Sequence, residues 1–252
     1  MGSTSSDRKA RAEQMRIDRE RAERRRRNLV TGGIVAGVVV LVAVAAAAIG
    51  LASDDGESDE TTDFPTDGIV YDQEAATGES SDDDPVDVVI YEDFQCPACA
   101  QFDALTRSVI ADHVEKGAIR VAYRPMNYID EYLANGSTDY SLRAANAARC
   151  VYEDAGGQAF HEFSRLLFED QQPEGGPGFS DEQYAAYAKQ AGASGIGKCL
   201  SDLPYKEDIE QRTRDFATSE VGENGTPAIL VDGESLTDRS AEGLSEAIDE
   251  AA

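Results

Sequence analysis

Cys96-Pro97-Ala98-Cys99 is the stretch whose residue types and spacing most directly indicate chemistry. Two thiols three positions apart, where an apolar run gives way to a helix-like stretch, are typical of a redox pair. At a helix N-terminus, unpaired backbone N–H groups favour a thiolate over a thiol. Pro97 suits the first helical turn, because a proline there loses no hydrogen bond. We therefore expect Cys96 to be the accessible, attacking sulfur and Cys99, one turn into the helix, to be shielded.

The two remaining cysteines, Cys150 and Cys199, are far apart in the sequence, and four cysteines allow three pairings. We predict a structural disulfide between these two, closing a loop of about 50 residues and contributing about 4 kcal/mol in the chain-entropy model. Two buried free thiols are one alternative. A tetrathiolate zinc site is another, but the second close cysteine pair of zinc ribbons is missing from the sequence. We therefore predict neither a metal nor a cofactor.

Charge is unevenly distributed along the chain. Residues 1–28 carry ten basic and five acidic side chains, whereas the remainder carries thirteen and forty-four. Between them, 29–52 is a run of 24 uncharged residues, long enough to cross a bilayer core of about 30 Å. We predict a single transmembrane helix over 29–52. A cleaved signal peptide is the alternative, although its apolar region is normally about 7–15 residues long.

The basic flank fixes the expected orientation. By the positive-inside rule, residues 1–28 stay in the cytoplasm and the acidic remainder faces outward, where disulfides persist. The cluster at 24–27 suffices as a topology signal, and contact with anionic membrane lipid is its functional alternative. The acidic remainder argues against a nucleic-acid partner, whose phosphates attract basic surfaces. We thus expect a single-pass cell-membrane protein with an extracytoplasmic domain.

Residues 53–84 have the composition of a tether. They include thirteen acidic and no basic residues, so they are expected to form a disordered linker. A β-prone run at 68–71 is the exception, and we expect a short edge strand there. The folded domain is predicted to occupy 85–252.

A βαβ unit is predicted to open this domain. The nearly continuous apolar run over 86–91 is typical of a central strand covered on both faces. Helical spacing of apolar residues predicts a helix from Pro97 to near Gly117, and alternation predicts a second strand over 119–124.

The region 127–224 lacks a convincing strand pattern and is predicted to be an all-helical insert. Its predicted helices cover 137–153, 158–169, 181–191 and 205–221. A strand over 228–231, a turn at Asp232-Gly233, a returning strand over 234–237 and a helix capped by Ser240 are expected to complete the domain.

Three features together resemble the DsbA-like branch of the thioredoxin family, in its membrane-anchored bacterial form, over roughly 67–252. They are the motif Asp93-Phe94-Gln95-Cys96-Pro97-Ala98-Cys99 followed by Phe102, the late Gly225-Thr226-Pro227 before a strand, and the helical insert between them. The combination is specific, whereas a lone Cys-x-x-Cys would be weak. The resemblance implies an α/β, thioredoxin-like fold: a mixed central sheet flanked by helices, with an all-helical insertion, here preceded by the transmembrane helix.

The resemblance also implies that the Thr226–Pro227 peptide is cis and lies against the Cys96 sulfur. Such a proline exposes neighbouring backbone groups, to which a substrate segment can add as a short strand. Thr226 and Pro227 are thus the expected substrate groove, with Pro97, Ala98, Phe94 and Glu92 as supporting residues. A trans proline that opens a strand is the alternative.

Two positions depart from the family pattern. Many members bury an acid six positions before the first cysteine, where it relays a proton to the second, and this chain has Ile90 there. Glu92 and Asp93 are candidate substitutes, with solvated strand-end carboxylates as the alternative. Ala98 stands where strongly oxidising relatives carry histidine, so we expect a milder oxidant.

The resulting hypothesis is a membrane-anchored, extracytoplasmic thiol:disulfide oxidoreductase that introduces disulfides into cysteine-containing exported proteins. The resemblance implies reoxidation by a quinone-linked membrane thiol oxidase. A reductase or isomerase of the same fold and a non-redox surface binding module are the alternatives. His113 and His161 are distant from the motif in sequence and are assigned no chemistry.

Overall fold

The computed structural model describes residues 64, 67–80, 84–134 and 137–252. The predicted cytoplasmic segment 1–28, the predicted transmembrane helix 29–52 and half of the predicted linker, 53–63, 65–66 and 81–83, lie outside the described residues. Within the part of the chain that is described, no helix combines the length and apolar composition needed to cross a membrane.

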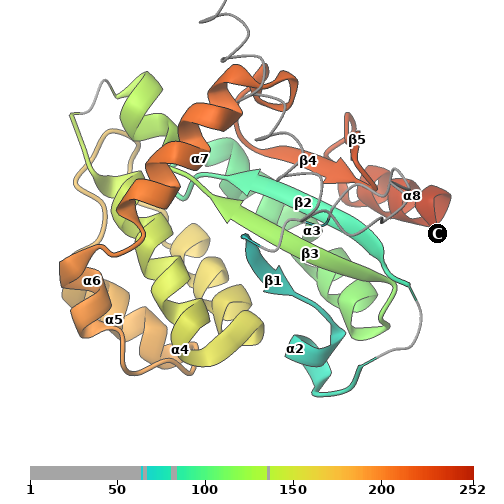
Figure 1. Ribbon diagram of the computed structural model, residues 1–252, viewed down its shortest axis with the longest axis horizontal. Helices are drawn as coiled ribbons and strands as arrows, with labels where there is room; N and C mark the ends of the chain where they lie inside the picture. The colour runs from blue at the N-terminus through green and yellow to red at the C-terminus, as the bar shows by residue number, and fades with distance from the viewer. Residues whose placement is uncertain (1–63, 65–66, 81–83, 135–136) are drawn as a thin grey trace, which may run out of the picture. The chain divides into compact units, whose positions relative to one another are not determined.

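A five-stranded mixed sheet forms the centre of the domain (Figure 1). Its strands are β1 (Ile69–Tyr71), β2 (Val86–Glu92), β3 (Ile119–Pro125), β4 (Ala228–Val231) and β5 (Glu234–Ser235), in the order β1-β3-β2-β4-β5. β2 and β3 are parallel, and the other neighbouring pairs are antiparallel. The predicted mixed sheet is therefore confirmed, with β2 in the middle and its carboxyl end leading into the cysteine motif.

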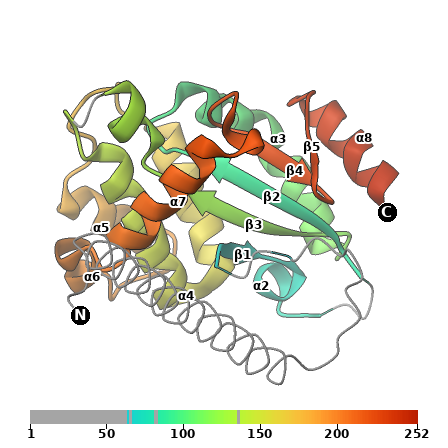
Figure 2. The ribbon, with the colours of Figure 1, turned by 45° about the horizontal axis from the view of Figure 1, so that its top comes forward.

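Helices cover both faces of the sheet because both faces of β2 are apolar. Ile90 faces the core that also holds residues of α3 (Pro97–Glu115) and α8 (Ala241–Ala251). The next residue, Tyr91, stacks on Phe216 of α7 (Lys206–Thr218) at a ring distance of 5.1 Å. Figure 2 accordingly shows α7 across one face and α3 behind the other.

The helical insert contains α4 (Tyr140–Glu169), α5 (Asp181–Gln190), α6 (Gly197–Asp202) and α7, with a π-helical turn at Ile129–Leu133 and a 3-10 turn at Glu220–Gly222. As predicted, the described residues between 127 and 224 form no strand. The two helices predicted at 137–153 and 158–169 are both present within α4, on either side of a kink at Gly156, whose φ is 81°. Helix α6 was not predicted, because its six residues contain one buried side chain, Leu200, and so show no apolar periodicity.

The boundary of the predicted linker is wrong. Residues 69–71 form β1, paired with β3 as the β-prone run suggested, and Gln73–Thr77 form a short helix, α2. Tyr71 is 2% exposed and stacks on His161 at 4.3 Å, which buries this segment in spite of its acidic composition. Asp72 caps α2 by accepting a hydrogen bond from the backbone of Ala75 at 2.9 Å. The acidic side chains are thus compatible with a folded segment, since they cap and cover it.

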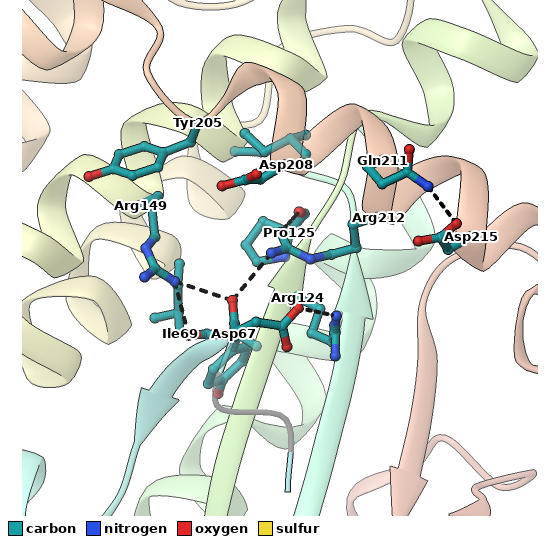
Figure 3. Close-up of a pocket in the computed structure, with 14 residues that line it drawn as sticks. Asp67, Ile69, Arg124, Pro125, Arg149, Tyr205, Asp208, Gln211, Arg212 and Asp215 are labelled. Carbon is teal, nitrogen blue, oxygen red and sulfur yellow. Dashed lines mark hydrogen bonds and ion pairs between the residues drawn. The ribbon is translucent and has the colours of Figure 1, made fainter. Parts of the chain in front are cut away.

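A pocket of about 390 Å³ lies between β1, β3, α4 and α7 (Figure 3). It is lined by three arginines and three aspartates, Arg124, Arg149, Arg212, Asp67, Asp208 and Asp215. Arg124 pairs with the Asp67 carboxylate at 2.6 Å, and both Arg149 and Arg212 donate to the Asp67 carbonyl at 3.3 Å. The formal charges of the three arginines and three aspartates cancel. The pocket is therefore best explained as a set of arginine contacts that hold the residues leading into β1.

Candidate active site

The cysteine motif occupies the turn between β2 and α3, as the sequence predicted. Cys96 is the N-cap of α3, with extended backbone (φ −76°, ψ 118°), and Pro97 is in the first helical turn. Pro97 and Ala98 are exposed, whereas Cys99 is 1% exposed. Cys96 is 7% exposed, less than an accessible nucleophile was expected to be. Its burial arises partly from the Thr226 carbonyl, which lies 3.4 Å from the Cys96 Sγ atom.

Both motif cysteines are free thiols in this structure, and their ionisation is strongly asymmetric. The pKa of Cys96 is lowered to about 6, chiefly because the Cys99 thiol hydrogen-bonds to its sulfur. Thr226 and the backbone N–H groups of Cys99 and Ala98 add to this and outweigh the opposing effect of burial. Burial in turn raises the pKa of Cys99 well above its ordinary value. At neutral pH the pair is therefore one thiolate and one thiol.

The Thr226–Pro227 peptide bond is cis, as the resemblance implied. It directly precedes β4, which pairs antiparallel with β2, so the loop lies opposite the end of β2 where the motif begins. The trans-proline alternative is wrong. Thr226 and Pro227 thus lie together with Cys96. Among the described residues of the insert, Gln171 is the one whose side chain donates to the Cys96 carbonyl, at 3.0 Å.

Glu92 and Asp93 are buried, 4% and 0% exposed, so the alternative that they are solvated strand-end carboxylates is wrong. Glu92 continues the inward-facing series of β2 two residues beyond Ile90, which is itself 1% exposed. Its Oε1 has no hydrogen-bond partner among the described residues. Burial, followed by the charge of Asp103 on α3, raises the pKa of Glu92 well above its usual range.

Asp93 is held by hydrogen bonds. Its carboxylate accepts from the Gln95 backbone at 2.8 Å, the Ser141 hydroxyl at 2.7 Å and the Ile129 backbone at 2.9 Å. Burial nevertheless raises its pKa to about 7. Asp93 also donates its backbone N–H to the Cys99 Sγ atom at 3.5 Å. The two neighbouring acids therefore differ: one has a free carboxyl oxygen, and the other is fully engaged.

Phe94 supports the turn from the core. Its ring is 0% exposed and packs on Phe168 with ring centroids 5.0 Å apart. Its carbonyl accepts hydrogen bonds from Gln171 Nε2 at 3.0 Å and from the Tyr140 hydroxyl at 3.3 Å. The ring and the carbonyl of Phe94 therefore both hold the backbone that leads to Cys96.

Sequence reasoning missed the residues that hold this turn from the insert, notably Asp130, Ser141 and Gln171. They lie 35 to 77 positions from their partners in the motif. A single sequence gives no signal for such side-chain pairs. The one local hint was Gln95, a polar residue directly before Cys96 that proves to be 0% exposed.

Cys150 and Cys199 are bonded to each other, with their Cα atoms 6.0 Å apart. The predicted pairing is confirmed, and the bond joins α4 to α6. His161 is buried against Tyr71, and burial lowers its pKa to about 3, which keeps it neutral. Among the residues described, no group of three or more His, Cys, Asp or Glu side chains is arranged to hold a metal ion.

A mixed sheet, a redox-competent thiol pair at a helix N-terminus and a cis proline beside it define a protein disulfide oxidoreductase of the thioredoxin fold. The family model described as Thioredoxin matches residues 73–250, and the chain belongs to this family. No curated protein sequence matches the chain.

Solved structures of DsbA-type enzymes are similar to this chain. The reduced disulfide bond oxidoreductase DsbG from Mycobacterium tuberculosis is 26% identical, with 74% of this chain and 88% of that one covered and a TM-score of 0.63. Oxidised DsbA from the same organism is 25% identical, with 73% and 92% covered and a TM-score of 0.61. MdbA, a thiol-disulfide oxidoreductase from Corynebacterium diphtheriae, is 25% identical, with 79% and 96% covered and a TM-score of 0.60.

Proposed function

We propose that this enzyme is an oxidant that introduces disulfides into cysteine-containing exported proteins. The observation that carries the proposal is the position of Cys96 at the N-cap of α3, where the Cys99 thiol and the backbone N–H groups of Ala98 and Cys99 lower its pKa to about 6. Burial raises the pKa of Cys99 beside it. A thiolate that is stable at neutral pH stabilises the reduced enzyme, and a stabilised reduced form makes the disulfide a better oxidant. The thiolate fraction falls as the pH drops through about 6, so this advantage is lost in acid.

The proposed cycle starts from the Cys96–Cys99 disulfide. A substrate thiolate attacks the Cys96 sulfur, and Cys99 leaves and takes up a proton. A second substrate thiolate then attacks the first substrate sulfur and displaces Cys96 as a thiolate. The substrate has then lost two electrons and holds a disulfide, while the enzyme has gained them and holds a thiolate and a thiol.

Glu92 is proposed to exchange that proton with Cys99. Its carboxyl is buried with one unpartnered oxygen, and its charge contributes to the raised pKa of Cys99. Replacing Glu92 with glutamine should slow closure of the Cys96–glutathione mixed disulfide at pH 7 by about tenfold or more, because Cys99 must lose its proton to attack. Stopped-flow mixing of reduced enzyme with glutathione disulfide measures this step.

The matched control is Glu115→Gln, the same chemical change at an exposed position at the end of α3. It should leave the closure rate unchanged. If the Glu92→Gln enzyme closed the mixed disulfide at the wild-type rate from pH 6 to 9, Glu92 would have no role in this proton transfer.

The equilibrium potential of Cys96–Cys99 against glutathione tests the direction of the reaction. We expect a value between about −120 and −270 mV, the span from a strong oxidant to thioredoxin. Ala98 places no charge or donor beside the thiolate, so the strongly oxidising end of the range is not expected. A potential below the range would assign the enzyme to the reductases, which work from the dithiol state.

The cellular setting is proposed from the sequence. The uncharged run 29–52 would anchor the enzyme in the cell membrane, with residues 1–28 in the cytoplasm and the catalytic domain outside. A quinone-linked membrane thiol oxidase would restore the disulfide. Fractionation of cells followed by protease treatment of intact spheroplasts, which should degrade the domain but leave the N-terminal segment, tests the arrangement.

A further inference from the structure

The turn between β2 and α3 is held mainly from the helical insert. Residues 93–96 form no regular element, yet Asp93 contacts both cysteines: its carbonyl accepts from the Cys96 N–H at 2.9 Å, and its N–H donates to Cys99 Sγ at 3.5 Å. Any displacement of Asp93 therefore shifts the two sulfurs relative to each other. What fixes Asp93 is the insert, through Ile129 and Ser141.

Gln95 makes a second connection between the turn and the insert. Its Nε2 donates to Asp130 Oδ1 at 3.0 Å and to Ser141 Oγ at 2.9 Å, and its Oε1 accepts from the backbone of Gly175. The side chain is 0% exposed, so an amide that lost one of these partners would find no water in its place. The Gln95 amide thus ties the residue directly before Cys96 to three points of the insert.

Ser141 and Asp130 join these connections into one network. The Ser141 hydroxyl accepts from Gln95 and donates to Asp93, and Asp130 Oδ2 accepts from the Leu142 backbone at 2.9 Å, at the start of α4. Ser141 is 0% exposed and Asp130 is 3% exposed. Buried hydrogen-bond networks in which each member has its partner specify one geometry. The network therefore transmits the position of α4 to the turn that carries Cys96.

We propose that the helical insert sets the reactivity of Cys96, with Asp93, Gln95, Asp130 and Ser141 as positioning residues. The inference rests on the part of the proposed function in which Cys96 is the attacking sulfur. The physical reason is geometric: the backbone N–H groups of Ala98 and Cys99 and the Cys99 thiol stabilise the Cys96 thiolate only when the turn holds the sulfur against them. A network that served the fold alone would contribute to stability and leave the thiol unchanged.

Ser141→Ala tests the proposal, because it removes the hydroxyl shared by Asp93 and Gln95 and leaves the titratable groups around the pair in place. Those groups are Glu92 on β2, Asp93 in the turn, Asp130 in the π-helical turn and Tyr140 on α4. The thiolate absorbance of the reduced, full-length enzyme, titrated from pH 4 to 9, should show the Cys96 transition about one pH unit higher than in wild type. The rate of reaction with glutathione disulfide at pH 6 should fall about tenfold.

The matched control is Ser164→Ala, since Ser164 is a second buried serine of α4, 1% exposed and contacted by Arg107 at 3.4 Å. It should lower the unfolding temperature without moving the Cys96 titration. If Ser141→Ala folds poorly, Asp130→Asn replaces it, because it keeps the shape and puts a donor against either the Gln95 amide or the Leu142 N–H. We expect the same upward shift.

A Ser141→Ala enzyme with the wild-type titration and rate, and only a lowered unfolding temperature, would overturn the proposal. The titration uses reduced enzyme without substrate, so its outcome does not depend on whether the enzyme is an oxidant. A failed proposed function would show in the potential, and a failed positioning role in the titration.

Discussion

Replacing Cys99 with serine should trap substrate proteins on the enzyme through Cys96. The substrate disulfide to Cys96 is normally broken by a second thiolate, either from the substrate or from Cys99, and removal of Cys99 leaves only the first route. Thr226 and the backbone N–H groups of positions 98 and 99, which also lower the pKa of Cys96, remain in this variant, so we expect the single remaining thiol to react with oxidised partners. Cell-envelope proteins separated without reductant should show high-mass species that contain the enzyme and collapse when reductant is added.

The control is Cys96→Ser, which should form no such adducts. Cys99 is 1% exposed and its pKa is raised by burial, so as the only thiol it is both covered and protonated. Alkylation at pH 6 should accordingly label Cys96 first in the reduced wild-type enzyme. Adducts of equal amount through Cys99 alone, or faster labelling of Cys99 at pH 6, would reverse the roles of the two cysteines.

The sequence alone predicted the framework that places this pair. The apolar run that became β2 and the proline after Cys96 are local signals, and local signals specify the strand, the helix start and the turn between them. The position of Thr226-Pro227 opposite Cys96 was inferred from the family resemblance and not from a local pattern in the sequence. Periodicity also predicted the βαβ unit and the strandless insert, whereas the mixed sheet was implied by the family resemblance.

What the sequence did not predict depends on contacts between distant positions. The network of Gln95, Asp130 and Ser141 joins residues 35 and 46 positions apart, and no periodicity marks it. The same holds for α2, which lies inside the predicted linker, whereas the edge strand before it was expected. Glu92 is different, since it lies two residues beyond Ile90 on the inward face of β2, and strand alternation extended by one residue would have placed it inside.

Glu92 and Asp93, the two buried acids where β2 ends, have different surroundings and different roles. Side chains alternate across a strand, so Glu92 points to the same face as Ile90, toward α3 and Cys99. Asp93 begins the turn and meets the insert instead, where Ile129 and Ser141 donate to its carboxylate; a third donor is the Gln95 backbone of the turn itself. Many family members have an acid at the position of Ile90. Glu92, which has a free carboxyl oxygen, is therefore the candidate replacement for that acid, whereas Asp93 holds the turn.

Removing the Cys150–Cys199 disulfide should have the largest effect on stability. The bond closes a loop between positions 49 apart, and in the chain-entropy model its loss lowers the free energy of unfolding by about 4 kcal/mol. The comparison is the Cys150→Ala, Cys199→Ala double variant against its parent, both in a Cys96→Ser, Cys99→Ser background so that no second disulfide contributes. Urea unfolding followed by circular dichroism should show a midpoint that falls and a slope that rises, because the unfolded chain without the cross-link is less compact.

The double variant should still fold, because other contacts join α4 to α6 and the residues after it. Asn146 donates to the Cys199 carbonyl at 3.2 Å and accepts from the Tyr205 backbone at 3.3 Å, and neither bond involves a sulfur. Reduced Cys150 and Cys199 that are freely alkylated in the folded, non-reduced wild-type protein would contradict the assignment of a structural disulfide. Ser141 lies on the same helix as Cys150. In a Cys150→Ala, Cys199→Ala variant that keeps Cys96 and Cys99, a rise in the pH of the Cys96 titration would therefore show that the insert acts on the thiol as one body.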